Sequence, residues 1–229
     1  MLFRSTLPTV WAVSSDEIDR ILGEGIPDIR KGMGERVFAM GTIFREIAAT
    51  YPKIGRFVNI YHPDAQGPLD ICELLWGSDL FYALLENPPR VHALMDIITQ
   101  TYETFMNAWA EITPFDPEVN CHWGMYIAGK LMLREDTSTN LSPELVEEFV
   151  LPYDQRLLDA FGGGAVHFCG RGTHIVDRLA TLKGVTAFNL SQPEMNDMEI
   201  VLTHTVDRGI NLIGVTPKAA ENLVQSGRS

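Results

Sequence analysis

The chain has 229 residues, of which 45% are hydrophobic and 21% are charged, as in a globular protein of one ordinary or large domain. Its formal net charge is −12, with 18 basic and 30 acidic residues, which argues against nucleic-acid binding through a basic surface. The sequence shows neither a signal peptide nor a run of about 20 apolar residues, so we expect no membrane-spanning segment.

The cysteines indicate the redox setting. Cys72, Cys121 and Cys169 are scattered and odd in number. This argues against a disulfide framework and predicts a reducing, cytoplasmic environment. No internal repeat or linker divides the chain, so we expect a single domain over residues 1–229.

The first part of the chain is expected to be mostly helical. Residues 8–13 form a short apolar run that predicts a strand, and a serine at 14 or 15 can cap the helix that follows. Helical segments then run from residue 16 to about 51, with glycine-rich interruptions. Residues 56–61 predict the first central strand.

From residue 56 onwards, predicted strands and helices alternate, which is typical of βαβ units and a parallel sheet. Ser142-Pro143-Glu144 marks one helix start clearly, and Pro152 should kink that helix. Further strands are expected at 123–127, 130–134, 165–169, 186–190 and 210–215, where the first two could be halves of one strand bent around Gly129. Helices are expected at 69–75, 87–112, 142–161, 174–182 and from 196.

The most informative stretch is 162–172, in which three glycines precede a short apolar run and a second glycine-rich turn follows it. If residues 165–169 form a strand, His167 and Cys169 lie on the same face. A thiolate and an imidazole at a strand end make half of a zinc site, and a catalytic zinc needs about three protein ligands. Glu135 is the candidate third ligand. Alternatively, the pair is inert, with a buried cysteine and a histidine that holds a backbone carbonyl.

Polar residues recur after four successive predicted strands, and in a parallel sheet or barrel these positions gather at one end. The sequence therefore predicts a site there. Asp64 could instead only form a turn, and Arg171 could bind an anionic substrate group or pair with an acid. The candidate catalytic residues are Asp64, Glu135 and Asp136. The candidate substrate-binding residues are His62, Gln66, Arg171, Asn189 and Gln192.

With these residues in place, the chain resembles the uroporphyrinogen decarboxylase superfamily from about residue 57 to 216. The resemblance rests on Gln66-Gly67-Pro68-Leu69-Asp70, on the segment from Ser142 to Tyr153, and on His167-Phe168-Cys169-Gly170. It implies an α/β fold of the TIM (β/α)8-barrel type. The His-x-Cys-Gly motif is similar to the zinc motif of the cobalamin-dependent methyltransferases, in which zinc presents a substrate thiolate to a methyl group on a corrinoid.

The chain departs from this family in two respects. The third zinc ligand of the family is usually a second cysteine far downstream, and no cysteine follows Cys169. The arginine-rich motif and the catalytic aspartate of the decarboxylases are not found.

About six strands are expected where a closed barrel has eight, so the barrel is incomplete, a piece of a longer chain, or completed in an oligomer. An unpaired strand edge would favour a homodimer.

The resemblance therefore implies a zinc-dependent methyltransferase that moves a methyl group to a small thiol from a corrinoid, bound by itself or carried by a partner protein. One alternative is a decarboxylase of a tetrapyrrole or small carboxylic acid, which needs no metal but needs several basic groups. The other is a non-catalytic binding module derived from the barrel.

Overall fold

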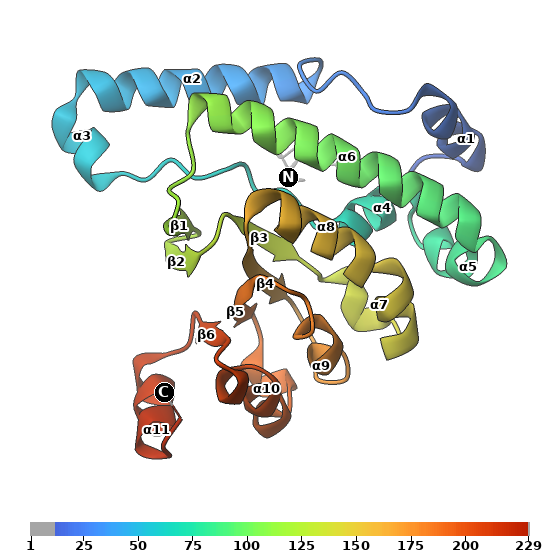
Figure 1. The fold of residues 1–229 in the computed structure, drawn as a ribbon. Coiled ribbons are helices and arrows are strands. Elements are labelled where there is room, and N and C mark those ends of the chain that lie inside the picture. Colours follow the sequence, from blue (N-terminus) through green and yellow to red (C-terminus); the bar gives the residue numbers. More distant parts are fainter. Residues whose placement is uncertain (1–11, 229) are drawn as a thin grey trace, which may run out of the picture.

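The computed structural model describes residues 12–228 and shows a mixed α/β fold (Figure 1). The helices are α1 (Ser15–Glu24), α2 (Met33–Thr50), α3 (Pro52–Phe57), α4 (Pro68–Trp76), α5 (Asp79–Glu86), α6 (Pro88–Ile112), α7 (Pro143–Phe149), α8 (Leu151–Phe161), α9 (Val176–Leu179), α10 (Met198–His204) and α11 (Pro217–Gln225). The strands are β1 (Val119–His122), β2 (Met125–Ala128), β3 (Leu131–Arg134), β4 (Gly164–Phe168), β5 (Val185–Leu190) and β6 (Asn211–Ile213). Over the described residues, no helix combines the length and the apolar character needed to cross a bilayer.

Four strands form a parallel sheet in the order β3-β4-β5-β6, so each strand lies beside its successor in the chain. Side chains alternate between the two faces. Val166 and Phe188 on one face join the main apolar core with the helices. Ala165 and Ala187 on the other face pack against Ile127 of the β1–β2 hairpin. The predicted parallel sheet is confirmed, although its four strands do not close into a barrel within residues 12–228.

The helical layer is built on α6, the 25-residue helix that follows Asn87. The helix predicted at 87–112 is confirmed, and its buried residues recur every three or four positions and face the common core. In Figure 1, α2 lies along α6, and α4 and α5 lie at the other end of the layer. The long helix is therefore the support against which the N-terminal helices pack.

The predicted helix at 142–161 is confirmed and is interrupted where proline requires it. Ser142 caps α7 by accepting a hydrogen bond from the Leu145 N–H group. The helix ends at Phe149 and a second one, α8, starts at Leu151 with Pro152 in its first turn. Proline has no N–H group and cannot continue the first helix, so the chain restarts.

Two strand predictions need correction. Residues 56–61 are not a strand, because α3 continues to Phe57 and residues 58–67 run without a strand partner in the described structure. Val58 favours extended backbone but has no neighbouring strand to pair with. The strand expected at 123–127 is the turn and second arm of a hairpin, in which Trp123 (φ 49°) and Gly124 (φ 75°) both take positive φ. Most of the strand expected at 8–13 lies outside the described residues.

The glycines before β4 serve packing. Gly162 ends α8 in the left-handed conformation, as glycine does at helix ends. A Cβ on Gly164 would lie 2.2 Å from the carbonyl oxygen of Leu131, so only glycine lets β4 start this close to β3. These glycines position the His-x-Cys strand and do not themselves indicate a ligand.

Candidate metal centre

The carboxyl ends of β3, β4 and β5 bring polar side chains together on the hairpin face of the sheet. The strand register places Arg134 beside His167, and His167 beside Asn189. Two positions further along each strand, the same face is continued by the next row of side chains. That row consists of Asp136, Cys169 and Ser191.

Three of these side chains form a group with their ligating atoms turned toward one another. Cys169 Sγ lies 3.5 Å from His167 Nε2, which lies 3.7 Å from Asp136 Oδ1. All three ligand atoms fall within 4.8 Å of one another. Around a tetrahedral zinc ion with bonds of about 2.0–2.3 Å, neighbouring ligand atoms are about 3.3–3.8 Å apart. The spacing therefore fits three protein ligands and leaves a fourth position for another group.

Asn189 determines which nitrogen of His167 is free. Asn189 Nδ2 donates to the carbonyl of Ile213 at 3.0 Å, so its Oδ1 faces His167 Nδ1 at 2.7 Å. Nδ1 therefore carries the proton, and Nε2, which faces Cys169, keeps its lone pair. Burial lowers the pKa of His167, so the ring is neutral at neutral pH. A metal-binding histidine is held in this way, with its other nitrogen donating to an oxygen.

Asp136 is held beside Cys169 by contacts on both its side chain and its backbone. Its Oδ1 accepts a hydrogen bond from the Cys169 N–H group at 2.7 Å, and its Oδ2 lies 3.3 Å from the Arg134 guanidinium. The buried carboxylate of Asp70, in the first turn of α4, accepts from the N–H groups of Asp136 (3.1 Å) and Thr137 (2.7 Å). Asp70 thus fixes the turn that follows β3.

The Cys169 thiol needs a cation to ionise at neutral pH. Burial has the largest effect and raises its pKa, the hydrogen bond with Ser191 Oγ at 3.3 Å lowers it by less, and the charge of Asp136 raises it again. A divalent cation would stabilise the thiolate and the carboxylate together. One sulfur, one imidazole nitrogen and one carboxylate oxygen are all donors that Zn²⁺ accepts. The residues present therefore fit zinc.

Glu135, the predicted third ligand and candidate catalytic acid, is not part of this group. Its side chain is fully buried and lies close to Asp154 of α8. Asp136 stands beside His167 and Cys169 in its place. Adjacent residues at a strand end point to opposite faces of the sheet, so only one of the two acids can reach the pair.

Glu135 and Asp154 form a buried pair of carboxyl groups. Their side chains are 0% and 1% exposed, and no hydrogen-bond donor reaches their oxygens among the described residues. Burial raises the pKa of both groups, to about 8 for Asp154. Two adjacent carboxylates without a counter-charge are costly in the interior, so the pair keeps at least one proton at pH 7.

Two of the expected substrate-site residues reach the centre through Arg134. Asp64 Oδ2 lies 3.2 Å from Arg134 Nη1. The Gln66 amide, with its nitrogen toward Asp70 Oδ2 (3.1 Å), places its oxygen 2.9 Å from the same guanidinium nitrogen. Arg134 also pairs with Asp136, so it joins the loop before α4 to the candidate ligands.

The other expected substrate residues are placed differently. His62 is buried, with Nδ1 2.8 Å from the carbonyl of Pro63. Gln192 Oε1 accepts from the Gly170 N–H group at 2.7 Å and so supports the loop after β4. Arg171 is exposed on that loop. The amide of Asn189, also expected to bind substrate, is engaged by His167 and Ile213.

Sequence reasoning missed two residues that shape the site, and a third, His122, was not among its candidates. Asp70 was noted only within a motif, because an acid in the first turn of a helix is ordinary. Asn196 accepts from the Gly172 N–H group and donates to the carbonyl of Gly170, but its only sequence signal was a helix start. His122 is buried, its Nε2 is 3.8 Å from Asp64 Oδ1, and burial lowers its pKa to about 3.

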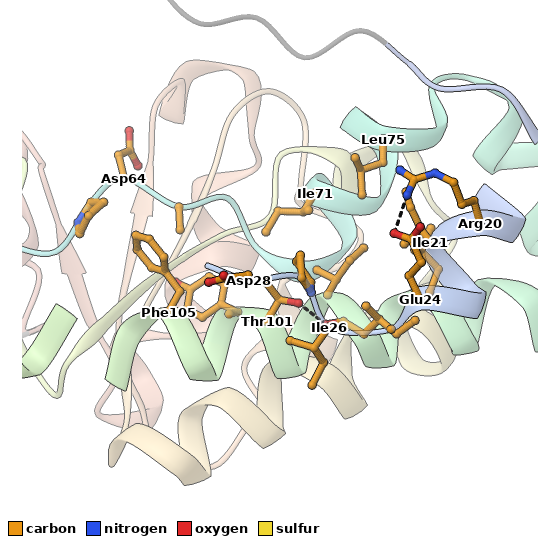
Figure 2. A pocket seen from close by; sticks show the side chains of 18 residues that line it. Arg20, Ile21, Glu24, Ile26, Asp28, Asp64, Ile71, Leu75, Thr101 and Phe105 are labelled. Atoms are coloured by element: carbon orange, nitrogen blue, oxygen red, sulfur yellow. Dashed lines mark hydrogen bonds and ion pairs between the residues drawn. The ribbon is translucent and has the colours of Figure 1, made fainter. Parts of the chain in front are cut away.

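An open pocket of about 720 Å³ lies between α1, α4 and α6 (Figure 2). Asp64 lies toward one end of it, and the ion pair of Arg20 and Glu24 lies toward the other. Apolar side chains such as Ile71 and Phe105 line most of the space between them. His167, Cys169 and Asp136 do not line this pocket, and Asp64, which does, is paired with Arg134 beside the candidate metal centre.

Replacing Asn189 by alanine should weaken zinc binding by about 10–100-fold, because outer-shell partners of metal-bound histidines have effects of that size. The change removes the acceptor that fixes His167. Asn189→Asp keeps an acceptor at this position and should bind zinc nearly as well as the wild type. Competition with a chromophoric chelator at pH 7.5 measures both affinities. An unchanged affinity in Asn189→Ala would show that the contact does not orient a ligand.

No protein-family model matches the chain, and a search of the curated proteins found no match. Function is therefore inferred from the geometry of the centre and from the motifs that form it.

Proposed function

We propose that the chain is a zinc-dependent enzyme that activates a thiol for methyl transfer. The observation that carries the proposal is the convergence of Asp136, His167 and Cys169 on one point. Catalytic zinc sites have about three protein ligands and an open position, whereas structural sites are closed by four. Zinc held here would lower the pKa of a substrate thiol and so supply a nucleophilic sulfur at neutral pH.

The other residues of the centre have supporting roles in this proposal. Asn189 keeps Nε2 of His167 available for the metal. Arg134 lies between Asp64 and Asp136 and offsets their charge. Asp64 is 42% exposed and is paired with Arg134, so it would hold the arginine in place while water takes up the proton that the substrate thiol loses. We place the chain in the cytoplasm, where thiols are kept reduced and Cys169 would stay available to a metal.

A methyl corrinoid is the proposed methyl donor, either as a free substrate or on a partner protein. Support comes from the likeness of His167-Phe168-Cys169-Gly170 to the motif of the cobalamin-dependent methyltransferases. The substrate sulfur forms the new C–S bond, and the electron pair of the broken Co–C bond stays with the corrinoid. Decarboxylation has less support, because Arg134 is already paired with two acids and Arg171 is a single exposed cation.

We also propose that the parallel sheet is part of a TIM-like barrel. Its strands follow one another in sequence order, and the helix-facing core lies on one side while the polar strand ends lie on the other. Barrels place their sites at the carboxyl ends of such strands. A doubly wound sheet would reverse its strand order and carry helices on both faces.

The test is a methyl-transfer assay with zinc-loaded protein, methylcobalamin and a panel of small thiols. Loss of the Co–C absorbance, together with formation of the methyl thioether by mass spectrometry, should require zinc and should disappear in Cys169→Ser. Cys121→Ser is the matched control, since it makes the same change in β1. Zinc-loaded protein that methylates no thiol would contradict the reaction. Zinc-independent release of carbon dioxide from a carboxylated tetrapyrrole would favour the decarboxylase, and tetrapyrrole binding without turnover would favour a binding module.

A further inference from the structure

Residues 30–61, which include helices α2 and α3, form an arm that the rest of the molecule covers poorly. Of the 18 residues of α2 only Phe38 and Gly41 are buried, and α3 has no buried residue. Residues 33–61 hold ten of the nineteen exposed large apolar side chains in the described chain, among them Phe44 (46%) and Phe57 (76%). Apolar exposure on this scale indicates an interaction surface.

The arm also differs from the rest of the chain in charge. Residues 30–61 contain six basic and two acidic residues, although the whole chain has a net charge of −12. Arg36, Arg45 and Lys53 on the arm are exposed. The arm is therefore apolar and positively charged, whereas the remainder of the molecule is strongly negative.

A surface of the opposite charge lies on α4 and α5. Residues 68–89, which span these two helices, contain four acidic residues and no lysine or arginine, and only Asp70 among the four acids is buried. Leu74, Tyr82 and Leu85 are 40%, 66% and 71% exposed there. The acidic patch comprises these three side chains with Glu73, Asp79 and Glu86. In Figure 1, α5 and α3 lie at opposite ends of the helical layer.

We propose that two copies of this chain form a symmetric dimer in which the arm of each copy binds the acidic patch of the other. Because the two surfaces lie at opposite ends of one layer, two layers packed antiparallel about a two-fold axis would make both contacts at once. Such an arrangement is closed and leaves neither surface free. Opposite charges across the contact favour this register over arm-to-arm pairing.

The size and shape of the arm agree with this partner. An aromatic side chain covers about 150–250 Å² when fully buried, so the four aromatic residues of the arm, which are 40–76% exposed, leave about 300–550 Å² to cover. Six aliphatic side chains that are 39–55% exposed add to this area. A stable interface needs about 800 Å² from each partner. A cleft of about 520 Å³ lies between the two helices of the arm, residues 58–64 and Trp109 of α6, and its helix side is lined by Met40, Phe44 and Ile54. Such a cleft suits protruding side chains such as Tyr82 and Leu85.

Variants with reversed charges on the arm or on the acidic patch test the proposal. Their oligomeric state is measured by sedimentation velocity at protein concentrations between 1 and 100 μM. The arm variant carries Arg36→Glu and Arg45→Glu, and the patch variant carries Glu73→Lys and Glu86→Lys. Wild type should sediment as a dimer, and each variant alone should dissociate with a Kd raised at least 10-fold. An equimolar mixture of the two variants should restore the dimer, and so should all four changes in one chain. Dimerisation should weaken in 0.5 M NaCl.

Arg208→Glu with Lys218→Glu is the matched control, since it makes the same charge change at exposed positions outside both surfaces. It should remain dimeric, and circular dichroism should show that every variant is folded. A wild type that is monomeric at 100 μM would overturn the proposal. So would a dimer that the arm and patch variants leave intact, or a monomer whose arm binds vesicles of anionic lipid.

Discussion

Substitution of Cys169 by serine, or of His167 by alanine, should reduce bound zinc from about one ion per chain to a small fraction of that. Each change removes one of three ligating atoms that lie within 4.8 Å of one another. The loss of affinity should exceed about 100-fold, because changes in the outer shell alone cost about 10–100-fold. Elemental analysis of protein purified in the presence of zinc, followed by chelator competition, measures the effect.

Two controls make this result specific. Cys121→Ser changes a cysteine of β1 that is outside the ligand group and should retain zinc. Glu135→Gln should also retain zinc, whereas Asp136→Asn should lose most of it, which separates the two adjacent acids. Full zinc content in Cys169→Ser would place the metal elsewhere in the protein, and loss of zinc in Glu135→Gln alone would restore Glu135 as the ligand.

The buried pair of Glu135 and Asp154 should make the folded protein less stable as the pH rises from about 4 to 8. The pKa of Asp154 is about 8 in the folded state and close to 4 in the unfolded chain, so the folded state binds more protons over this range. Stability falls with pH wherever the folded state binds more protons. Asp154→Asn removes the contribution of Asp154 and leaves that of the buried Glu135. It should raise the free energy of unfolding at pH 8 relative to wild type by at most about 5 kcal/mol, since one pKa unit corresponds to about 1.4 kcal/mol.

Urea unfolding at pH 5, 6.5 and 8 measures this difference. Buried histidines such as His62, whose pKa is lowered by burial, act in the opposite direction below about pH 6.5. The difference in free energy of unfolding between Asp154→Asn and wild type therefore isolates the carboxyl pair, whereas the pH dependence of the wild type alone does not. Asp159→Asn on the exposed side of α8 is the control and should leave the slope unchanged. A gap between Asp154→Asn and wild type that does not grow with pH would show that the pair is not protonated at pH 5.

The elements that were predicted well are those whose own residues determine them. The periodicity of α6 and the cap, proline and acid at the start of α7 are local signals, and both helices are confirmed. The prediction of a strand at residues 56–61 was wrong because a strand depends on residues that are distant in the chain. A strand exists only when a neighbour supplies its hydrogen bonds, and residues 58–61 have none in the described structure.

The candidate site shows the same division between local and distant information. His167 and Cys169 were found because their spacing on one strand places them on one face. Which of Glu135 and Asp136 lies beside His167 and Cys169 depends on how β3 pairs with β4, and this register cannot be deduced from the sequence. Asn189 was recognised as a residue of the site, but its contact with His167 depends on how β5 pairs with β4.

The hydrogen-bonded line from His167 through Asn189 to the carbonyl of Ile213 crosses three strands and joins residues far apart in the chain. A metal ion bound at one end of this line would therefore restrain the final strand as well as the ligands. Ligand binding to the folded state alone adds about 4 kcal/mol of stability when the free ligand is at 1,000 times its Kd. Zinc bound at this site would then slow proteolysis of the polypeptide, so the supply of zinc would influence the abundance of this protein.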